Sequence, residues 1–287
     1  MTTETTFDAA AYKESTRQQW DEAAEAWHRW GPFLEEWLGE ATELMLDLAG
    51  VGDGARVLDL AAGAGGQTIA AARRVGPSGA VLATDISERI LEHAADEARR
   101  QGLANVAVQA VDTEELDVTP GSFDAAISRL GLIYFPDRAG ALARILSALR
   151  SGGRFATVTY SLPERNGFFA EPVSVVRRRA ELPPPPPGSP GPFSLATPDV
   201  FEMEFGAAGF VDVEVRTVAA PVVLSSAAEC ARFERESFGA LHQMLSALDE
   251  SEQLAAWTEV GEALGKYESP DGFVGPCELI VAAGTRS

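Results

Sequence analysis

The chain has 287 residues, of which 46% are hydrophobic, and this length allows one sizeable core with an insertion or a cap. It carries 23 basic and 43 acidic residues, for a formal net charge of -20, and its only lysines are Lys13 and Lys266. This charge would repel a phosphate backbone or an anionic membrane surface, so we expect neither nucleic acid nor a membrane as a partner.

The cysteines and the first residues of the chain bear on the cellular compartment of the protein. Cys230 and Cys277 lack the short spacing of a zinc site or a redox motif, and we expect them to be buried thiols in a reducing compartment. The first residues have no basic start followed by an apolar stretch, and no apolar run reaches the roughly 18 residues of a membrane span. A cytoplasmic protein is therefore expected.

Strand and helix patterns alternate through the first half of the chain. Helical spacing of Trp, Leu and Met predicts two short helices between Trp20 and Leu48, separated at Gly31 and Pro32. Strands are then predicted over 56–60, 80–84, 106–111, 123–128 and 154–160, and helices over 67–75, 87–101 and 139–149. Strands that are apolar throughout and alternate with helices favour a mostly parallel, doubly wound sheet with both faces covered.

The pattern changes after Tyr160. The prolines at 183–187 can form neither a helix nor a central strand, so a stiff exposed connection beside a cap is expected there. The elements predicted after it are a helix over 198–208, a strand over 211–223, helices over 226–248 and 251–267, and a strand over 278–282.

The stretch VLDLAAGAGGQT, from Val57 to Thr68, connects a strand that ends in an acid to a loop with almost no side chains. Ligands of open α/β sheets bind beyond the carboxyl ends of the strands, near the point where the strand order reverses. The loop Ala61–Gly66 lies at such an end and leads into a helix N-terminus, whose amides and dipole favour a negative group. The missing side chains at Gly63 and Gly65 would let a ligand approach the backbone.

Two kinds of ligand compete for this loop. A dinucleotide site requires the pattern Gly-x-Gly-x-x-Gly, and here Thr68 stands at the position of the third glycine, so that fingerprint is broken. Asp85, in the segment ATDIS, lies at about the distance from the loop at which an acid binds ribose hydroxyls. That acid would serve either ligand, so it does not decide between them.

The segments VLDLAAGAGGQT, ATDIS, AVDTEEL, SFDAAISRLGLIYFPD and LRSGGRF follow one another in this order. Together they resemble the class I S-adenosylmethionine-dependent methyltransferases, in particular the small-molecule branch related to the ubiquinone and menaquinone biosynthesis C-methyltransferases. The resemblance covers about 20–160 and is weaker from Gly209 onward. It implies a Rossmann-like α/β fold with a mostly parallel seven-stranded sheet and a helical cap. It also implies S-adenosylmethionine as cofactor and S-adenosylhomocysteine as product.

With this fold, the chain is expected to divide into four parts. These are N-terminal helices that cap the cofactor site over 1–54, the Rossmann-like core over 55–160, a proline-rich cap insertion over 161–208, and the last strands with a helical insertion near 225–267 over 209–287.

The resemblance assigns the amino-acid end and the ribose of the cofactor. Asp59 and the backbone of Gly63, Ala64 and Gly65 would hold the methionyl amine and carboxylate, and Asp85 would accept both ribose hydroxyls. Each acid also has a simpler interpretation. Asp59 could cap the next turn, and Asp85 could cap the helix that follows it.

The remaining cofactor contacts are implied by the next strand ends. Ile86 would pack on the adenine, Asp112 would accept the adenine amino hydrogens, and Thr113 would lie beside the ring. Ser128 and Arg129 would line the methionyl end and the methyl exit. Asp112 could instead be a turn former, and Arg129 could equally pair with an acid of the cap.

The implied reaction is an in-line displacement in which the acceptor attacks the sulfonium methyl. Alignment and exclusion of water would supply most of the catalysis, and a base is needed only where the acceptor loses a proton. His28 and His242 are the candidates for that base, and for each a packing or surface role is the alternative. His93 is expected to face solvent. Tyr134 could polarise a substrate group or simply pack with Phe135.

The acceptor is expected to be a hydrophobic or aromatic small molecule of specialised or quinone metabolism, methylated on carbon, oxygen or nitrogen. The aromatic residues that could close over the cofactor are Trp20, Trp27, Trp30, Trp37, Phe168, Phe169, Phe233 and Phe238, with core packing as the alternative. No metal site is expected, because Ser128, Arg129 and Leu130 stand where a metal-assisted enzyme would need acidic oxygen ligands. A homodimer is a possible assembly.

Two other functions are compatible with the same residues. One is a protein of this fold that binds the cofactor without transferring methyl, as a regulator or a cyclisation catalyst. The other is an NAD(P)-dependent oxidoreductase, which Thr68 and Asp59 disfavour.

Overall fold

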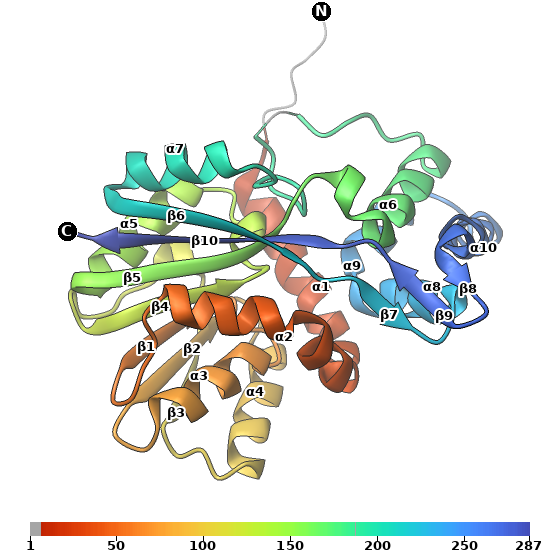
Figure 1. The fold of residues 1–287 in the computed structure, drawn as a ribbon. Helices are drawn as coiled ribbons and strands as arrows, with labels where there is room; N and C mark the ends of the chain where they lie inside the picture. Colours follow the sequence, from red (N-terminus) through yellow and green to blue (C-terminus); the bar gives the residue numbers. More distant parts are fainter. Residues whose placement is uncertain (1–6, 187) are drawn as a thin grey trace, which may run out of the picture.

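The computed structural model of the chain describes residues 7–186 and 188–287. Its centre is a seven-stranded sheet with the strand order β3-β2-β1-β4-β5-β10-β6 (Figure 1). These strands are β1 (Arg56–Leu60), β2 (Ala80–Asp85), β3 (Val106–Ala110), β4 (Phe123–Arg129), β5 (Leu149–Tyr160), β6 (Phe210–Ala219) and β10 (Glu278–Arg286). The doubly wound, mostly parallel α/β fold is thereby confirmed.

The strand order reverses between β1 and β4, which both run parallel to their neighbours. Only β10 runs antiparallel, paired with β5 on one side and β6 on the other. The buried strands β1 and β4 are apolar because both faces of the sheet centre are covered. The carboxyl ends of β1, β2 and β4 therefore meet at one edge, where a ligand of this fold would bind.

Helices cover both faces of the sheet. On one face lie α2 (Gly31–Leu48), α3 (Gly66–Val75) and α4 (Glu88–Arg100), and on the other lie α5 (Arg138–Ala148) and α7 (Pro198–Ala208) (Figure 1). Ser87 caps α4 by accepting a hydrogen bond from the Ile90 amide, and Asp137 caps α5 in the same way through Gly140. Each of these two N-cap residues fixes where its helix begins.

A second lobe lies at one end of the sheet. It contains α6 (Gly167–Arg179), α8 (Ala227–Ser237), α9 (Gly239–Leu245), α10 (Glu250–Leu264) and a small antiparallel sheet of β7 (Val222–Leu224), β9 (Gly272–Gly275) and β8 (Glu268–Ser269). The small sheet continues the β6–β10 pair, because β6 leads into β7 and β9 leads into β10 (Figure 1). The Ala220 amide donates to the Cys277 carbonyl at 2.9 Å where the two sheets meet. We call this second lobe the cap.

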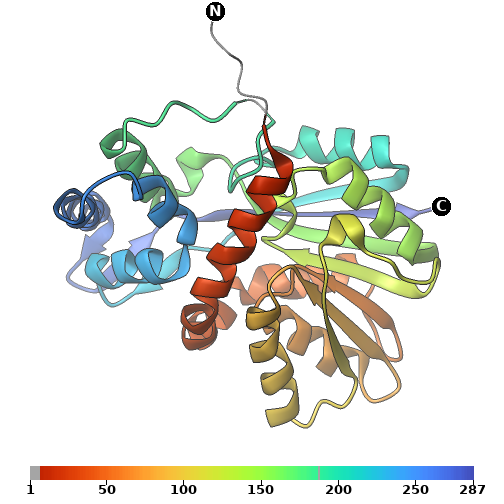
Figure 2. The ribbon, with the colours of Figure 1, turned by 180° about the vertical axis from the view of Figure 1, so that it is seen from behind.

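The helix α1 (Ala9–Arg29) runs between the cap and the carboxyl edge of the main sheet (Figure 2). It packs against α4 on the sheet side and against α8 and α9 on the cap side. Trp27 donates from Nε1 to the Ser237 carbonyl at 2.9 Å, and Ser87 donates to the Asp21 carboxylate at 2.6 Å. The N-terminal helix thus joins the two lobes across the edge where the parallel strands end.

Several predicted elements differ from the structure. The strand predicted over 211–223 is divided into β6 and β7, and the helix predicted over 226–248 is divided at Phe238 into α8 and α9. Sequence periodicity missed both breaks, because apolar residues continue across the junction of the two sheets and across Phe238. The short strands β8 and β9 were not predicted. The last strand extends to Arg286 rather than Ala282 because its second half pairs with both β5 and β6.

The proline-rich segment is an exposed connection without helix or strand over 183–186, and position 187 lies outside the described residues. Its far end is held at the short turn after β4, where Gly191 and Ser194 both donate to the Ile133 carbonyl. The following helix α7 packs on β6, β10 and α5 rather than in the cap. The expected cap insertion over 161–208 therefore contributes only its first part, α6, to the cap.

An aromatic cluster holds α1, α2 and the cap together. Phe233 of α8 is fully buried, and its ring centroid lies 5.1–6.1 Å from those of Trp30, Phe33, Trp37 and Phe238. Trp37 also donates from Nε1 to the Ala220 carbonyl at 2.8 Å, beside the junction of the two sheets. Edge-to-face rings at these distances add to the free energy of apolar burial.

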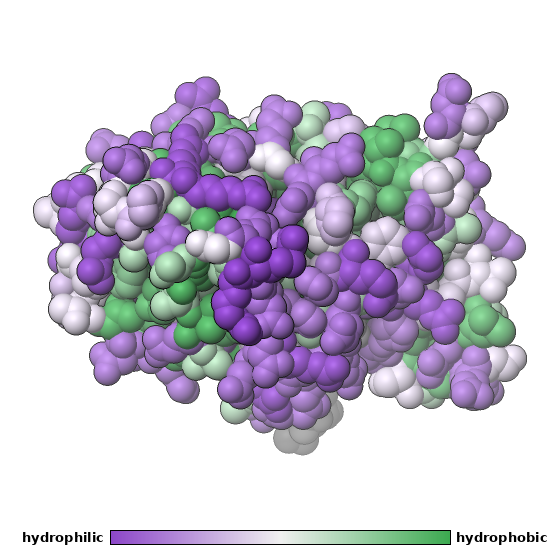
Figure 3. Space-filling view, turned by 90° about the horizontal axis from the view of Figure 1, so that it is seen from below, coloured by the Kyte–Doolittle hydropathy of each residue, from purple (hydrophilic) through white to green (hydrophobic). Residues whose placement is uncertain are grey.

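The surface agrees with the strongly acidic composition. The face seen from below is mostly hydrophilic, with hydrophobic residues in separate small patches (Figure 3). None of the helices in the described part of the chain is both long enough and apolar enough to span a membrane.

The aromatic cluster yields a stability prediction. Phe233→Ala should lower the free energy of unfolding by about 3–5 kcal/mol, because it leaves a cavity among four aromatic rings. Leu254→Ala on α10 is the control, since Leu254 is 61% exposed and should change stability by no more than about 0.5 kcal/mol. Urea unfolding followed by circular dichroism measures both. A loss below about 1 kcal/mol for Phe233→Ala would mean that the cluster does not join the lobes.

Candidate active site

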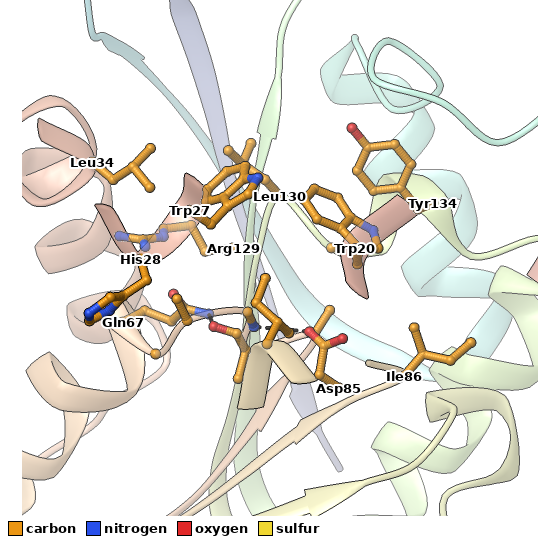
Figure 4. A pocket seen from close by; sticks show the side chains of 18 of the residues that line it. Trp20, Trp27, His28, Leu34, Gln67, Asp85, Ile86, Arg129, Leu130 and Tyr134 are labelled. Atoms are coloured by element: carbon orange, nitrogen blue, oxygen red, sulfur yellow. Dashed lines mark hydrogen bonds between the residues drawn. The ribbon is translucent and has the colours of Figure 1, made fainter. Parts of the chain in front are cut away.

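A cavity of about 650 Å³ opens at the carboxyl edge of the main sheet, beneath α1 (Figure 4). Its floor is the loop after β1, its sides are the ends of β2, β3 and β4, and its roof is the N-terminal part of the chain. The volume lies within the roughly 300–1,000 Å³ of small-molecule sites.

The loop after β1 is shaped by two close approaches. At Gly65, φ is 88°, and a Cβ atom there would lie 2.6 Å from the Ala94 Cβ of α4. At Gly66, a Cβ atom would lie 2.8 Å from an Arg129 guanidinium nitrogen. Only glycine fits at position 65, whereas a side chain at position 66 would require the Arg129 guanidinium to move. Gly65 as N-cap gives α3 no side-chain hydrogen bond. The free amides of the first turn of α3 therefore remain available to an anionic group.

Asp85, at the end of β2, connects the loop after β1 with the start of α4. Its carboxylate accepts hydrogen bonds from the amides of Gly63 and Ser87, both at 2.9 Å, and it lines the cavity. Burial raises the pKa of Asp85 to about 6, although the amide hydrogen bonds oppose the shift. The predicted site residues Gly63, Ala64, Gly65 and Ile86 line the cavity beside it.

Asp59 does not line the cavity. It is fully buried, and its carboxylate accepts hydrogen bonds from the Thr68 hydroxyl and, at 3.3 Å, from the Gln67 amide. Gln67 also donates to the Ala62 carbonyl at 3.0 Å and is itself part of the cavity wall. Asp59 thus supports the first turn of α3 from behind. The pKa of its carboxyl is raised by burial to about 7.

The last two residues of β4, Ser128 and Arg129, differ in their relation to the cavity. Arg129 lines the cavity, and its guanidinium donates to the Thr42 hydroxyl at 3.0 Å. Burial lowers the pKa of Arg129 to about 10, partly offset by the nearby charge of Asp59, so the group stays cationic at neutral pH. Ser128 is fully buried in the sheet and does not line the cavity, because successive side chains of a strand point to opposite faces.

Asp112 and Thr113 line the opposite end of the cavity, but Asp112 is not free. Lys13 of α1 pairs with its carboxylate at 2.7 Å and also with Glu114, while the Glu114 amide donates to the other Asp112 oxygen. The pKa of Lys13 is raised, because these two acids outweigh the partial burial of the ammonium group. Sequence reasoning missed Lys13, and only the crossing of α1 over this edge reveals its place.

An aromatic wall made of Trp20, Trp27 and Tyr134 bounds the cavity on the cap side (Figure 4). The Trp20 ring lies 5.5 Å from Trp27 and 5.8 Å from Tyr134, both edge to face. Burial raises the pKa of Tyr134 above its usual value, so its phenol can donate a hydrogen bond but is a poor base.

The other aromatic residues proposed for the pocket do not reach it. Trp30, Trp37, Phe168, Phe169, Phe233 and Phe238 are buried core residues and are absent from the cavity wall. For these six residues the alternative of core packing is confirmed. They pack behind the wall because α2, α6 and α8 meet there.

The structure separates the candidate histidines. His28 lies at the cavity, and its ring stacks on His93 of α4 at 4.5 Å. The expectation that His93 faces solvent is wrong, since its side chain is only 16% exposed where α1 packs on α4. His242 lies outside the cavity on α9, where its ring bonds to the Arg235 carbonyl at 2.6 Å.

Comparisons with known proteins agree with this geometry. A family model described as a methyltransferase domain matches residues 52–178. The aklanonic acid methyltransferase DauC of Streptomyces sp. (strain C5) is 33% identical over 147 residues, which cover 51% of this chain and 66% of that protein. The ubiquinone/menaquinone biosynthesis C-methyltransferase UbiE of Idiomarina loihiensis is 36% identical over 119 residues, 41% of this chain and 47% of that protein.

A solved structure shares the fold over most of the chain. It is the phosphoethanolamine N-methyltransferase 2 of Haemonchus contortus in complex with phosphomonomethylethanolamine and S-adenosylhomocysteine, with a TM-score of 0.55 and 20% identity. The match covers 90% of this chain and 57% of that one. The aligned part of this chain thus spans two thirds or less of each of these three proteins.

The matched residues 52–178 contain the glycine loop, Asp85, Asp112 and Arg129. The seven-stranded sheet, the cavity at its strand-order reversal and the family match all identify the same edge of the molecule. Over residues 52–178 this chain is therefore similar to a methyltransferase domain, and the two relatives described above are named as methyltransferases.

Proposed function

We propose that this protein transfers the methyl group of S-adenosylmethionine to a hydrophobic or aromatic small molecule of specialised or quinone metabolism. The observation that carries the proposal is a single cavity that combines Asp85, the glycine loop and Arg129 with an aromatic wall. The first three suit a nucleoside with an amino-acid tail, and the aromatic wall suits an apolar acceptor. Two relatives named for small-molecule methylation, one of aklanonic acid and one in quinone biosynthesis, support this acceptor class.

The cavity residues fit the cofactor part by part. The Asp85 carboxylate has acceptor capacity beyond its two amide bonds and would bind the ribose hydroxyls, with Ile86 and Thr113 beside the adenine. The uncapped start of α3 and the Arg129 guanidinium would hold the carboxylate of the methionyl part. Asp59, fully buried behind the loop, would act on the amine only through Gln67 and Thr68.

At the adenine end, Lys13 and the adenine amino group would both bind the Asp112 carboxylate. Asp112 would accept the adenine amino hydrogens, yet Lys13 already pairs with its carboxylate. A carboxylate has about four lone-pair positions, so Asp112 can serve both partners. Lys13 would then hold α1 over the bound nucleoside.

The chemistry that the bound cofactor supplies is an activated methyl on a sulfonium. The protein would align the reactants and exclude water, since Trp20, Trp27 and Leu130 shield the cavity on the cap side. Tyr134 would orient the acceptor by donating a hydrogen bond. His28 is the histidine placed to take up a proton where the acceptor must lose one, whereas His242 lies outside the cavity.

A cofactor-binding protein without methyl transfer remains the second candidate function. Methyl-labelled S-adenosylmethionine and a panel of aromatic hydroxy and keto acceptors distinguish the two. Label in the acceptor, together with S-adenosylhomocysteine, supports transfer, whereas a converted acceptor with intact cofactor supports a cyclisation catalyst. Failure to bind either form of the cofactor in calorimetry would overturn both.

We also propose that the protein is cytoplasmic. Cys230 and Cys277 are both buried free thiols, in keeping with a reducing compartment such as the cytoplasm. The homodimer remains a prediction, and size-exclusion chromatography with light scattering tests it.

Asp85→Asn should weaken binding of S-adenosylhomocysteine by about tenfold or more, because the amide loses the charge-assisted hydrogen bonds to the ribose. Asp124→Asn is the matched control. Asp124 lies at the start of β4, at the opposite edge of the sheet, and contacts Arg56 and Arg150 there. Calorimetry that gives equal affinities for wild type and Asp85→Asn would remove the assignment of Asp85.

Cofactor affinity and stability should change in opposite directions between pH 5 and 7.5. The folded pKa values of Asp85 and Asp59, about 6 and about 7, lie above the ordinary value of 3.8. The folded state therefore binds more protons than the unfolded state in this range, and stability of the free protein falls as pH rises. Affinity for the cofactor should rise as Asp85 ionises.

Thermal unfolding and calorimetry at a series of pH values measure the two trends. Asp85→Asn should flatten the affinity profile near pH 6. An affinity in the wild type that does not change between pH 5 and 7.5 would contradict ionisation of Asp85 as the requirement for binding.

A further inference from the structure

Behind the aromatic wall lies a group of polar side chains that the cofactor site does not use. Glu234 and Ser237 of α8 and Tyr160 at the end of β5 are each no more than 1% exposed. In the part of the chain that the structure describes, both Glu234 carboxyl oxygens, the Ser237 hydroxyl and the Tyr160 hydroxyl have no hydrogen-bond partner. We call these three residues the buried polar cluster.

Unpartnered buried groups of this kind are costly and rare in native proteins, and each requires an explanation. Glu234 and Ser237 are about one turn apart on α8, and Glu234 contributes to the raised pKa of Tyr160, after burial, so the three side chains lie in one region. Three residues from two elements that all remain unpaired indicate a place kept for a ligand. Burial raises the pKa of Glu234 well above its ordinary value, which favours the neutral carboxyl, a form that can both donate and accept a hydrogen bond.

The buried polar cluster adjoins the cavity through the aromatic wall. Trp27 lines the cavity, and its Nε1 donates to the carbonyl of Ser237 itself. The Phe238 ring, next along the chain, lies 6.1 Å from the Trp27 ring. Glu234 and the cavity residue Tyr134 are close enough for Glu234 to contribute to the raised pKa of Tyr134, after burial and Tyr12. Rotation of the Trp27 and Phe238 side chains would open a path from the cavity to the buried polar cluster.

We propose that Glu234, Ser237 and Tyr160 form the polar end of the acceptor site and bind an uncharged oxygen, a hydroxyl or a carbonyl, carried by an aromatic ring system. This inference rests on the proposed function and specifies its acceptor. The aromatic residues Trp27, Phe169 and Phe238 surround the approach and would contact the ring faces.

The test uses the full chain and two probes of similar shape. 1-Naphthol carries the hydroxyl, and 1-methylnaphthalene carries a methyl group in its place. Calorimetry with S-adenosylhomocysteine present should show that the wild type binds 1-naphthol about tenfold more tightly than it binds 1-methylnaphthalene. Glu234→Leu should abolish this difference, and Glu234→Gln should retain most of it, because an amide also donates and accepts.

Two further variants keep the test independent of folding defects. Tyr160→Phe removes only a hydroxyl and should reduce the preference for 1-naphthol severalfold. Glu202→Leu, on the exposed side of α7, is the matched control and should leave it unchanged. Glu234→Leu should also unfold at a higher temperature than the wild type, since it removes an unpartnered buried carboxyl.

Three results would overturn the proposal. They are a wild type with no preference for 1-naphthol, a preference that persists in Glu234→Leu and Tyr160→Phe, and a crystal structure with ordered water alone on Glu234 after soaking with 1-naphthol. S-adenosylhomocysteine should bind equally to all these proteins. Its failure to bind the wild type would instead refute the proposed function, whatever the probes do.

Discussion

The carboxylate of Asp85 is the contact on which the site depends. By accepting from the amides of Gly63 and Ser87 it fixes the end of β2, the glycine loop after β1 and the start of α4 relative to one another. In the same arrangement Gly65 lies against Ala94 of α4 and Gly66 lies against the Arg129 guanidinium. A floor of backbone with one acid at its side results, and it is held by hydrogen bonds rather than by large side chains. This suits a ligand that must lie directly on the loop.

Three buried acids of this protein differ in how far their carboxylates are satisfied by hydrogen bonds. Asp59, Asp85 and Glu234 all lie where water is excluded, and each has a raised pKa for that reason. Their uses differ according to their partners. Asp59 is satisfied by Thr68 and Gln67 and supports the loop, Asp85 keeps acceptor capacity toward the cavity, and Glu234 has no partner among the described residues. The degree of satisfaction, more than burial itself, separates a supporting acid from one that can bind a ligand.

The helix α1 gives the cavity its roof and its connection to the cap. Lys13 reaches Asp112, Asp21 reaches Ser87, and Trp27 reaches Ser237, so residues along the length of one helix contact the sheet edge and the cap. Cofactor and acceptor would therefore meet beneath the same helix. The aromatic cluster around Phe233 supports this arrangement from behind without forming part of the cavity wall.

The pattern of apolar strands and intervening helices determined the sheet, and the order of short motifs placed the loop, Asp85, Asp112 and Arg129 at one edge of it. These features are local, because strand ends and glycine turns depend on neighbouring residues. Only the tertiary structure decided that Asp59 supports the loop from behind, that Ser128 faces away, that Lys13 pairs with Asp112, and that Glu234 lies unpartnered behind Trp27. The direction of a side chain and its distant partners depend on how α1 and the cap pack on the sheet. No spacing along the chain records that packing.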